Sequence, residues 1–316
     1  MSAKTGIEWT DATWNPITGC SKVSQGCKHC YALRDWTRLA SNHKTVYSGR
    51  AFTDVVCHSE RLDKPLRWQK PRMIFVNSMS DLFHEDVPFQ FIADVFAVMA
   101  CTTRHTYQVL TKRPARMLDF FAWLNEELDV FGHPARVDSL RVWPQWTSAH
   151  GKRAGYDNCG PLWPLENVWL GVSVENQDAA NERIPLLLKT PAAVRWVSIE
   201  PLIGSINIDI WLDQLPAVVD QRPRLDWVVV GGESGTHARP MHQNWVRIIR
   251  DQCAEAGVPF LFKQWGEWLP DNQNPRVGPP HDENGAIRVG KKAAGRLLDG
   301  VKHDGYPVTM VYGGRA

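Results

Sequence analysis

The chain has 316 residues, of which 43% are hydrophobic and 22% charged, a composition typical of a globular protein. The formal net charge of +2 permits a polyanionic partner without requiring one, and seven cysteines without paired spacing exclude an ordinary secreted disulfide framework. Because the N-terminus has no apolar signal segment and no apolar run reaches transmembrane length, we expect a cytoplasmic protein without a membrane partner.

Three cysteines near the N-terminus form the clearest motif. Cys20, Cys27 and Cys30 are spaced C-x6-C-x2-C and are expected to follow the first strand. Thiolates this close together usually bind a metal ion or cluster, because one loop can direct them to a common point. Three thiolates fit an iron–sulfur cluster that leaves one iron open to a small molecule. The alternative is a zinc ion with His29 or a distant cysteine as its fourth ligand.

A repeated pattern follows the cysteine loop, in which a short apolar run ends in polar or glycine residues before a helical stretch. Such runs suit strands buried on both faces of a parallel sheet. The predicted strands are residues 73–77, 107–110, 168–172, 194–199, 227–230 and 259–262, and the predicted helices are 88–99, 115–127 and 244–256. Strand centres recur about every 30 residues where no insertion intervenes, which is the size of a βα unit.

These elements predict an α/β fold, a partial or full TIM-like (β/α)6-7 barrel with the cluster loop after its first strand. The active site of such a barrel lies at the carboxyl ends of the strands, where the polar clusters fall. We expect residues 1–270 to form this barrel, with an insertion at about 129–167, and residues 271–316 to form a C-terminal extension that packs on it.

The insertion combines aromatic and basic side chains, a mixture that binds unpaired bases by stacking and phosphate contacts. The extension adds Lys291, Lys292 and Arg296. Both features favour a nucleic-acid partner. The alternative is that the tryptophans of the insertion simply pack a long loop onto the barrel.

The cysteine loop, together with the segments FVNSMSDLFH, QVLTKRP, LGVSVEN, SIEPLIG and VVVGGESG, resembles the radical S-adenosylmethionine (radical SAM) superfamily, in particular a phage-associated family with this three-cysteine motif. The resemblance covers residues 6–268. The usual motif is C-x3-C-x2-C with a ring before the last cysteine. Here the spacer has six residues and His29 stands at the ring position. The longer spacer, residues 21–26, either widens the loop around the cluster or touches the substrate.

The resemblance implies a 4Fe–4S cluster on Cys20, Cys27 and Cys30, with S-adenosylmethionine (SAM) on the open iron. One electron, from a donor such as flavodoxin or ferredoxin, would cleave SAM to a 5′-deoxyadenosyl radical that removes a hydrogen atom from the substrate. The protein would work in the cytoplasm, that of the bacterial host if it is phage-encoded.

The resemblance also assigns residues at the strand ends to SAM. The second-strand end would hold the SAM amino group through Asn77, Ser78, Ser80 and Asp81, with a helix N-cap as the alternative for the last two. The fourth and fifth strands would offer Ser173, Glu175, Asn176, Ser198 and Glu200 to the ribose. For Glu200 the alternative is a salt bridge to Lys112 or Arg113.

Further candidates lie near the last strands. Gly232 and Glu233, within the turn GGESG, would admit adenine or substrate, although a plain turn is the alternative. Lys263 or Arg239 would hold a substrate carboxylate. Cys159, in the insertion, is a candidate hydrogen donor or second metal ligand.

The phage relatives implied by the resemblance suggest DNA, with modified thymine bases, as the substrate. The reaction we expect is base modification, for example an isomerase that moves a glycyl group from nitrogen to carbon attachment on a hypermodified thymine. The alternatives are a DNA-lesion repair lyase of the spore-photoproduct-lyase type, peptide modification, and a zinc-binding nucleic-acid module without catalysis.

Overall fold

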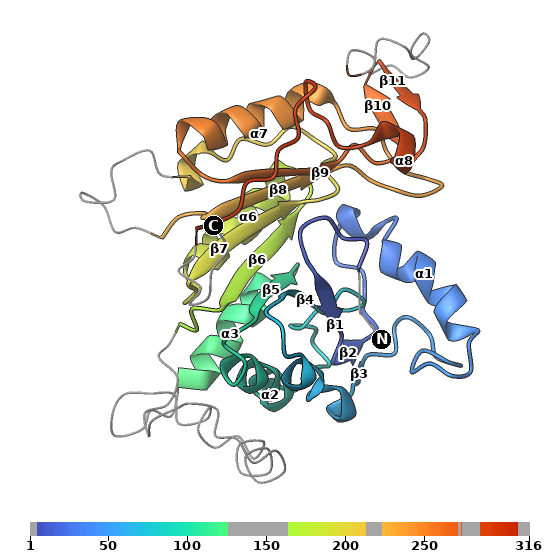
Figure 1. Ribbon diagram of the computed structural model, residues 1–316, viewed down its shortest axis with the longest axis vertical. Coiled ribbons are helices and arrows are strands. Elements are labelled where there is room, and N and C mark those ends of the chain that lie inside the picture. The colour runs from blue at the N-terminus through green and yellow to red at the C-terminus, as the bar shows by residue number, and fades with distance from the viewer. Residues whose placement is uncertain (1–4, 126–163, 213–222, 271–272, 274–284, 309–316) are drawn as a thin grey trace.

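A computed structural model describes residues 5–125, 164–212, 223–270, 273 and 285–308. Within these residues seven parallel strands form one curled sheet in the order β1-β4-β5-β6-β7-β8-β9, a half barrel (Figure 1). The strands are β1 Ala12–Trp14, β4 Met73–Val76, β5 Thr106–Thr111, β6 Val168–Val174, β7 Val194–Ile199, β8 Trp227–Gly231 and β9 Phe260–Gln264. The predicted α/β class is confirmed, and the barrel is partial.

Helices connect the strands and cover the convex face of the sheet. The α-helices are α1 Tyr31–Ala40, α2 Phe89–Ala100, α3 Pro114–Asn125, α6 Gln177–Leu188, α7 Gln243–Glu255 and α8 Lys291–Ala294. Short 3-10 helices are η1 Gln25–Cys27, η2 Ser59–Arg61, η3 Lys64–Arg67 and η4 Asp209–Trp211. In the main core, buried side chains of α2, α3, α6 and α7 pack against every second side chain of the strands. No helix among the described residues is both long and apolar enough to cross a membrane.

The concave face of the sheet is filled at one end and open at the other. Trp169, Trp196 and Trp227 pack there with Trp9, and the rings of Trp9 and Trp196 lie 5.2 Å apart. Gly171 makes room for this layer, because a Cβ at that position would lie 2.6 Å from the Trp196 ring. Towards the carboxyl ends the same face carries small residues, so the tryptophans close the base of the half barrel and leave space above them.

The cysteine loop lies at this open end. β1 pairs in parallel with β4, and the short strands β2 Ile17–Thr18 and β3 Val56–Cys57 pair antiparallel beside it. Cys20 follows β2, and Cys30 is the residue before α1. The loop therefore follows the first strand of the barrel, as the sequence predicts.

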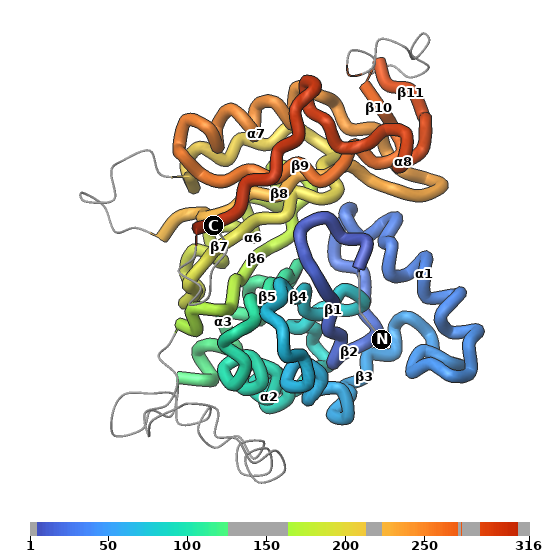
Figure 2. Tube along the Cα trace, in the orientation of Figure 1, coloured from blue at the N-terminus to red at the C-terminus, as the bar shows by residue number. Residues whose placement is uncertain are grey.

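The described part of the C-terminal extension returns to the barrel edge. β10 Trp268–Pro270 and β11 Ala286–Arg288 form a hairpin, and α8 follows it. The chain then runs beside β9, where Gly305 N donates to Phe260 O at 3.0 Å (Figure 2). The Tyr306 ring stacks on Trp227 at 5.3 Å. These contacts cover the exposed edge of β9.

Most of the predicted insertion, including Cys159, lies outside the described residues. Its contribution to nucleic-acid binding and the proposed role of Cys159 therefore stay predictions.

Candidate functional site

A cavity of about 320 Å³ opens at the carboxyl ends of the strands, above the tryptophan layer. It is lined by the three cysteines of the loop and by residues from the ends of β4 to β9. The predicted site residues on its wall are Cys20, Cys27, His29, Cys30, Asn77, Ser78, Ser80, Asp81, Ser173, Ser198, Glu200, Gly232, Glu233 and Lys263. Glu175 and Arg239 do not line the cavity but contact residues of its wall.

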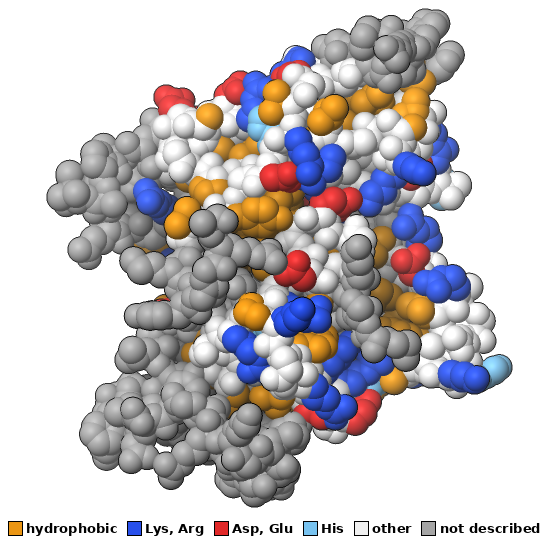
Figure 3. All heavy atoms as spheres, in the orientation of Figure 1, with side chains coloured by type: hydrophobic (Ala, Val, Ile, Leu, Met, Phe, Trp, Pro, Cys, Tyr) orange, Lys and Arg blue, Asp and Glu red, His pale blue; other side chains and the backbone are white. Residues whose placement is uncertain are grey.

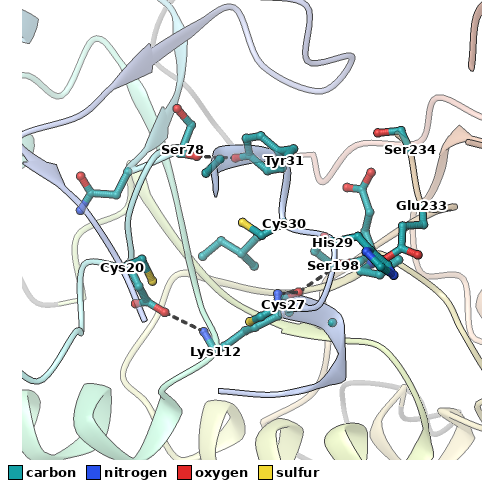
Figure 4. A pocket seen from close by; sticks show the side chains of 18 of the residues that line it. Cys20, Cys27, His29, Cys30, Tyr31, Ser78, Lys112, Ser198, Glu233 and Ser234 are labelled. Atoms are coloured by element: carbon teal, nitrogen blue, oxygen red, sulfur yellow. Dashed lines mark hydrogen bonds between the residues drawn. The ribbon is translucent and has the colours of Figure 1, made fainter. Parts of the chain in front are cut away.

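The three cysteine side chains stand around this cavity (Figure 4). Cys20 is anchored by its backbone, because its N–H donates to Phe52 O at 2.8 Å. Burial and the nearby Asp81 carboxylate raise the pKa of the Cys20 thiol to about 12, against the opposing effect of Arg113. Metal binding here would therefore have to displace the Cys20 proton.

Asn77 occupies a special position at the end of β4. It adopts the left-handed conformation, with φ of 62°, which asparagine tolerates better than most residues. Its Oδ1 accepts from Ile17 N at 3.3 Å, which fixes the orientation of the amide. Its Nδ2 is buried without a hydrogen-bond partner among the described residues; Asn77 is only 3% exposed and lines the cavity.

A second unsatisfied polar atom occurs where Glu200, directly after β7, meets Lys263 and Gln264 of β9. Lys263 Nζ lies 2.8 Å from Glu200 Oε1, so Glu200 pairs with Lys263 and not with Lys112 or Arg113. Gln264 Nε2 donates to Glu200 Oε1 at 3.3 Å, which leaves Gln264 Oε1 buried without a partner in the described part of the chain. Together with Trp9 Nε1, these make three unsatisfied polar atoms, two donors and one acceptor, on residues that line one cavity.

Ser78, Ser80 and Asp81, which follow β4, form hydrogen bonds and an ion pair mainly with other residues of the protein. Ser80 Oγ donates to Ile17 O at 2.9 Å, and Ser78 Oγ donates to Asn15 at 3.2 Å. Asp81 accepts from Thr111 Oγ1 at 2.7 Å and pairs with Arg113 at 3.2 Å. The helix N-cap considered for Ser80 and Asp81 is not formed, because α2 begins only at Phe89.

Lys112, at the end of β5, presents a cation to the cavity. Its Nζ donates to Ser173 Oγ at 2.6 Å, and no carboxylate among the described residues pairs with it. Ser173 in turn donates to Glu200 O at 3.3 Å. A partly buried ammonium held by one hydroxyl can bind a ligand carboxylate or phosphate.

Other predicted residues are held in ion pairs. Glu233 accepts three hydrogen bonds from Arg239 at 2.6 to 2.9 Å. Burial alone would raise the pKa of Glu233, but these hydrogen bonds outweigh it and hold the pKa below its ordinary value. Glu175 pairs with Arg183 at 3.0 Å. Gly232 is required by packing, since a Cβ there would lie 1.9 Å from Trp265 O.

The sequence did not single out Tyr31, Arg183 or Gln264. Tyr31 lines the cavity and donates through its hydroxyl to Ser78 O. Its position directly after Cys30 was a usable signal, as was that of Gln264 after Lys263. Arg183 gave no signal, because an arginine within a helix is ordinarily on the surface.

The sequence leaves two kinds of bound group open for the cysteines, a zinc ion or an iron–sulfur cluster, and the side chains of the cavity can be compared with each. No three His, Cys, Asp or Glu side chains in the described ranges come close enough to hold a single metal ion. These residues therefore offer no preformed zinc site. Three cysteines around a cavity of this size, with an unsatisfied donor at Asn77 and an unsatisfied acceptor at Gln264, fit a larger group with polar atoms of its own.

A family model described as "Protein of unknown function (DUF5131)" matches residues 4–307, nearly the whole chain. The sequence matches none of the curated proteins compared with it. Among solved structures, a mutant of spore photoproduct lyase aligns with a TM-score of 0.38 and 11% identity, over 78% of this chain and 63% of its own. This chain thus spans less than two thirds of the length of that structure.

Proposed function

We propose that this chain, which belongs to the DUF5131 family, binds a 4Fe–4S cluster through Cys20, Cys27 and Cys30 and SAM at the open iron. The observation that carries the proposal is that the three cysteines line one cavity together with Asn77 and Gln264, each of which has a buried polar atom without a partner among the described residues. When bound, the pair of cofactors supplies a 5′-deoxyadenosyl radical for removing a hydrogen atom from a substrate.

The residues of the cavity suit the polar ends of SAM. Asn77 Nδ2 is a hydrogen-bond donor, so it would hold the carboxylate of its methionine part. The free Oε1 of Gln264 would accept from a hydroxyl or amino group. The sequence predicted that Asn77 accepts from the amino group; its Oδ1 already accepts one hydrogen bond from Ile17 N, and we assign its Nδ2 to the carboxylate instead.

The apolar floor of the cavity supports radical chemistry. Trp9, Phe75 and Leu110 line it, and Trp9 and Phe75 are buried. A floor of mainly apolar side chains excludes water from the reacting atoms, which protects a reactive intermediate from side reactions.

For the substrate we propose an anionic one, DNA with modified thymine bases. Each acidic residue of the cavity wall is paired with a cation: Asp81 with Arg113, Glu200 with Lys263, Glu233 with Arg239. The remaining basic residues of the wall are Lys22, Arg34, Lys112 and Lys291, of which Arg34 lies 3.8 Å from Asp35 and Lys291 lies 3.6 Å from Glu8. An excess of positive charge attracts phosphate groups, and Lys and Arg side chains are spread over the face of the molecule in Figure 3.

The reaction proposed on this substrate is movement of a glycyl group from nitrogen to carbon attachment on thymine. Lys263 and Arg239, the residues expected to hold the glycyl carboxylate, already pair with carboxylates. Lys112 has no such partner among the described residues and would be the better group for this role.

The test is anaerobic purification and reconstitution with iron and sulfide, followed by reduction in the presence of SAM. We expect a brown protein with roughly four irons per chain that releases 5′-deoxyadenosine. Cys27→Ala should lose iron and SAM cleavage together, whereas Cys101→Ala, which alters a cysteine outside the cavity, should keep both. A colourless protein holding one zinc per chain would refute the proposal.

The substrate is tested in the same reaction. Thymine-modified DNA should increase the release of 5′-deoxyadenosine. Its glycyl group should move from nitrogen to carbon attachment on the thymine without a change in the mass of the DNA. Equal release with and without DNA would exclude DNA as the substrate and leave the cofactor assignment standing.

A further inference from the structure

The spacer between Cys20 and Cys27, residues 21–26, has twice the length of the usual radical SAM spacer. In the structure it runs across the open end of the half barrel, and Ser21, Lys22, Val23 and Gly26 line the cavity. Three side chains from different strand ends contact it, and each of them is itself fixed by a carboxylate or guanidinium partner.

The first contact comes from Arg113, after β5. Its Nη2 donates to Ser21 O at 3.2 Å and to Ser21 Oγ at 2.8 Å, and its Nη1 lies 3.8 Å from Cys20 Sγ. Arg113 is buried and is held by Asp81 at 3.2 Å and by Glu85 at 3.0 Å. Because its donors are directed at two carboxylates and at Ser21, the Arg113 guanidinium fixes the Cys20 end of the spacer.

The second contact comes from Glu175, after β6. Its Oε1 accepts from Gly26 N at 3.3 Å, and its Oε2 pairs with the buried Arg183 at 3.0 Å. The approach is close, because a Cβ at Gly26 would lie 2.9 Å from Glu175 Oε2 and 3.3 Å from Lys112 Cε. Both oxygens of Glu175 are therefore engaged within the protein, and Glu175 does not line the cavity, so its suggested contact with the ribose hydroxyls stays a prediction.

The third contact comes from Arg239, after β8. Its Nη2 donates to Gln25 O at 3.1 Å, while Glu233 fixes the same guanidinium. Gln25 begins the 3-10 helix η1 that ends at Cys27. The spacer is thus held at both ends, by groups that belong to the rigid strand ends of the barrel.

We propose that Arg113, Glu175 and Arg239 are positioning residues that hold the spacer across the mouth of the half barrel and so preset Cys20 and Cys27 for cluster binding. This inference rests on the proposed function in taking the cysteines as cluster ligands. A loop that populates the binding-competent arrangement only part of the time binds more weakly by that fraction, so holding the spacer raises the affinity for the cluster.

The test uses Gly26→Ala, which drives a methyl group against Glu175 and Lys112. The matched control is Gly204→Ala, where the nearest atom to the new Cβ lies at an ordinary 3.6 Å. Amide hydrogen exchange is measured on the cluster-free proteins, and half-saturation is measured during iron–sulfur reconstitution. A second variant, Arg239→Lys, keeps the positive charge but cannot reach both Glu233 and Gln25 as the guanidinium does.

We expect Gly26→Ala to speed exchange across residues 20–27 about tenfold and to raise the iron concentration at half-saturation several-fold, with an unchanged melting temperature. Arg239→Lys should increase the exchange rate and the iron concentration at half-saturation by smaller factors. Gly204→Ala should match the wild type in both quantities. A role in global stability alone would lower the melting temperature without this local change in exchange.

If exchange and half-saturation are unchanged in Gly26→Ala and Arg239→Lys, the inference about the spacer is overturned. The proposed function still stands in that case if the wild type binds its iron–sulfur cluster. Faster exchange in both variants together with a wild type that binds no iron would instead refute the proposed function. Because exchange is read without the cluster, the two failures are distinguishable.

Discussion

The ion pair between Lys263 and Glu200 lies at the centre of the candidate site, and its energetic weight can be worked out. Lys263 Nζ is 2.8 Å from one oxygen of Glu200 and 2.9 Å from the other. The two side chains are only 14% and 18% exposed. The Glu200 carboxylate lies close against Gly231, where a Cβ would come within 3.0 Å of its Oε1.

Lys263→Met removes the cation and leaves the carboxylate of Glu200 with the hydrogen bond from Gln264 at 3.3 Å. Breaking a fully buried pair costs about 3–5 kcal/mol, and an exposed pair contributes about 0–1 kcal/mol. The partial exposure of this pair places the expected loss between these limits, at about 2–3 kcal/mol of unfolding free energy.

The assay is urea unfolding of the cluster-free protein near neutral pH, compared at constant m value. The double variant Lys263→Met/Glu200→Gln should recover at least half of the loss, since no uncompensated charge remains. Lys302→Met is the control, because Lys302 is 56% exposed and pairs with Asp304 at 2.9 Å. We expect it to cost less than about 1 kcal/mol. A loss in Lys263→Met no larger than in Lys302→Met, or a double variant less stable than the single one, would refute this reasoning.

Three further predictions concern single positions. Asn77→Gly keeps the left-handed backbone but removes the free Nδ2, so SAM should bind the reconstituted protein about tenfold more weakly by calorimetry, and unaltered affinity would count against Asn77 as a ligand. Gly232→Ala places a Cβ 1.9 Å from Trp265 O and should lower unfolding free energy by at least about 2 kcal/mol, which a normal denaturation midpoint would contradict. Burial lowers the pKa of His105 from 6.5 to about 4, so the stability contributed by the neutral ring is present above pH 6.5 and is lost as pH falls towards 4. The loss is at most about 3 kcal/mol, and His105→Gln should flatten this part of the pH profile of stability; an unchanged profile would show that another group is responsible.

The strand positions could be predicted because parallel strands buried on both faces leave continuous apolar runs in the chain. Residues 194–199 were predicted as one strand and are observed as β7 with the same limits. Helix ends were less well determined: the helix predicted at 244–256 is observed as α7 Gln243–Glu255. Helix boundaries depend on capping interactions that periodicity does not report.

The pairing of charged residues could not be predicted in the same way. Glu200 was expected, if structural, to meet Lys112 or Arg113, but its partner Lys263 lies 63 residues further along the chain. Arg113 instead reaches back 92 residues to Ser21. Each partner is chosen by which strand ends the curvature of the sheet brings together, and the local sequence carries no record of that curvature.

The sequence by itself determined that three cysteines lie on one loop at the active end of a parallel α/β sheet, because spacing along the chain and apolar periodicity are local properties. Tertiary structure alone decided which polar groups are free and which are used. Within the part of the chain that the structure describes, Asn77 and Gln264 are left with unsatisfied atoms, while Glu175 and Arg239 hold residues 21–26. Whether a polar atom has a partner depends on groups distant in the chain, and folding alone brings those groups together.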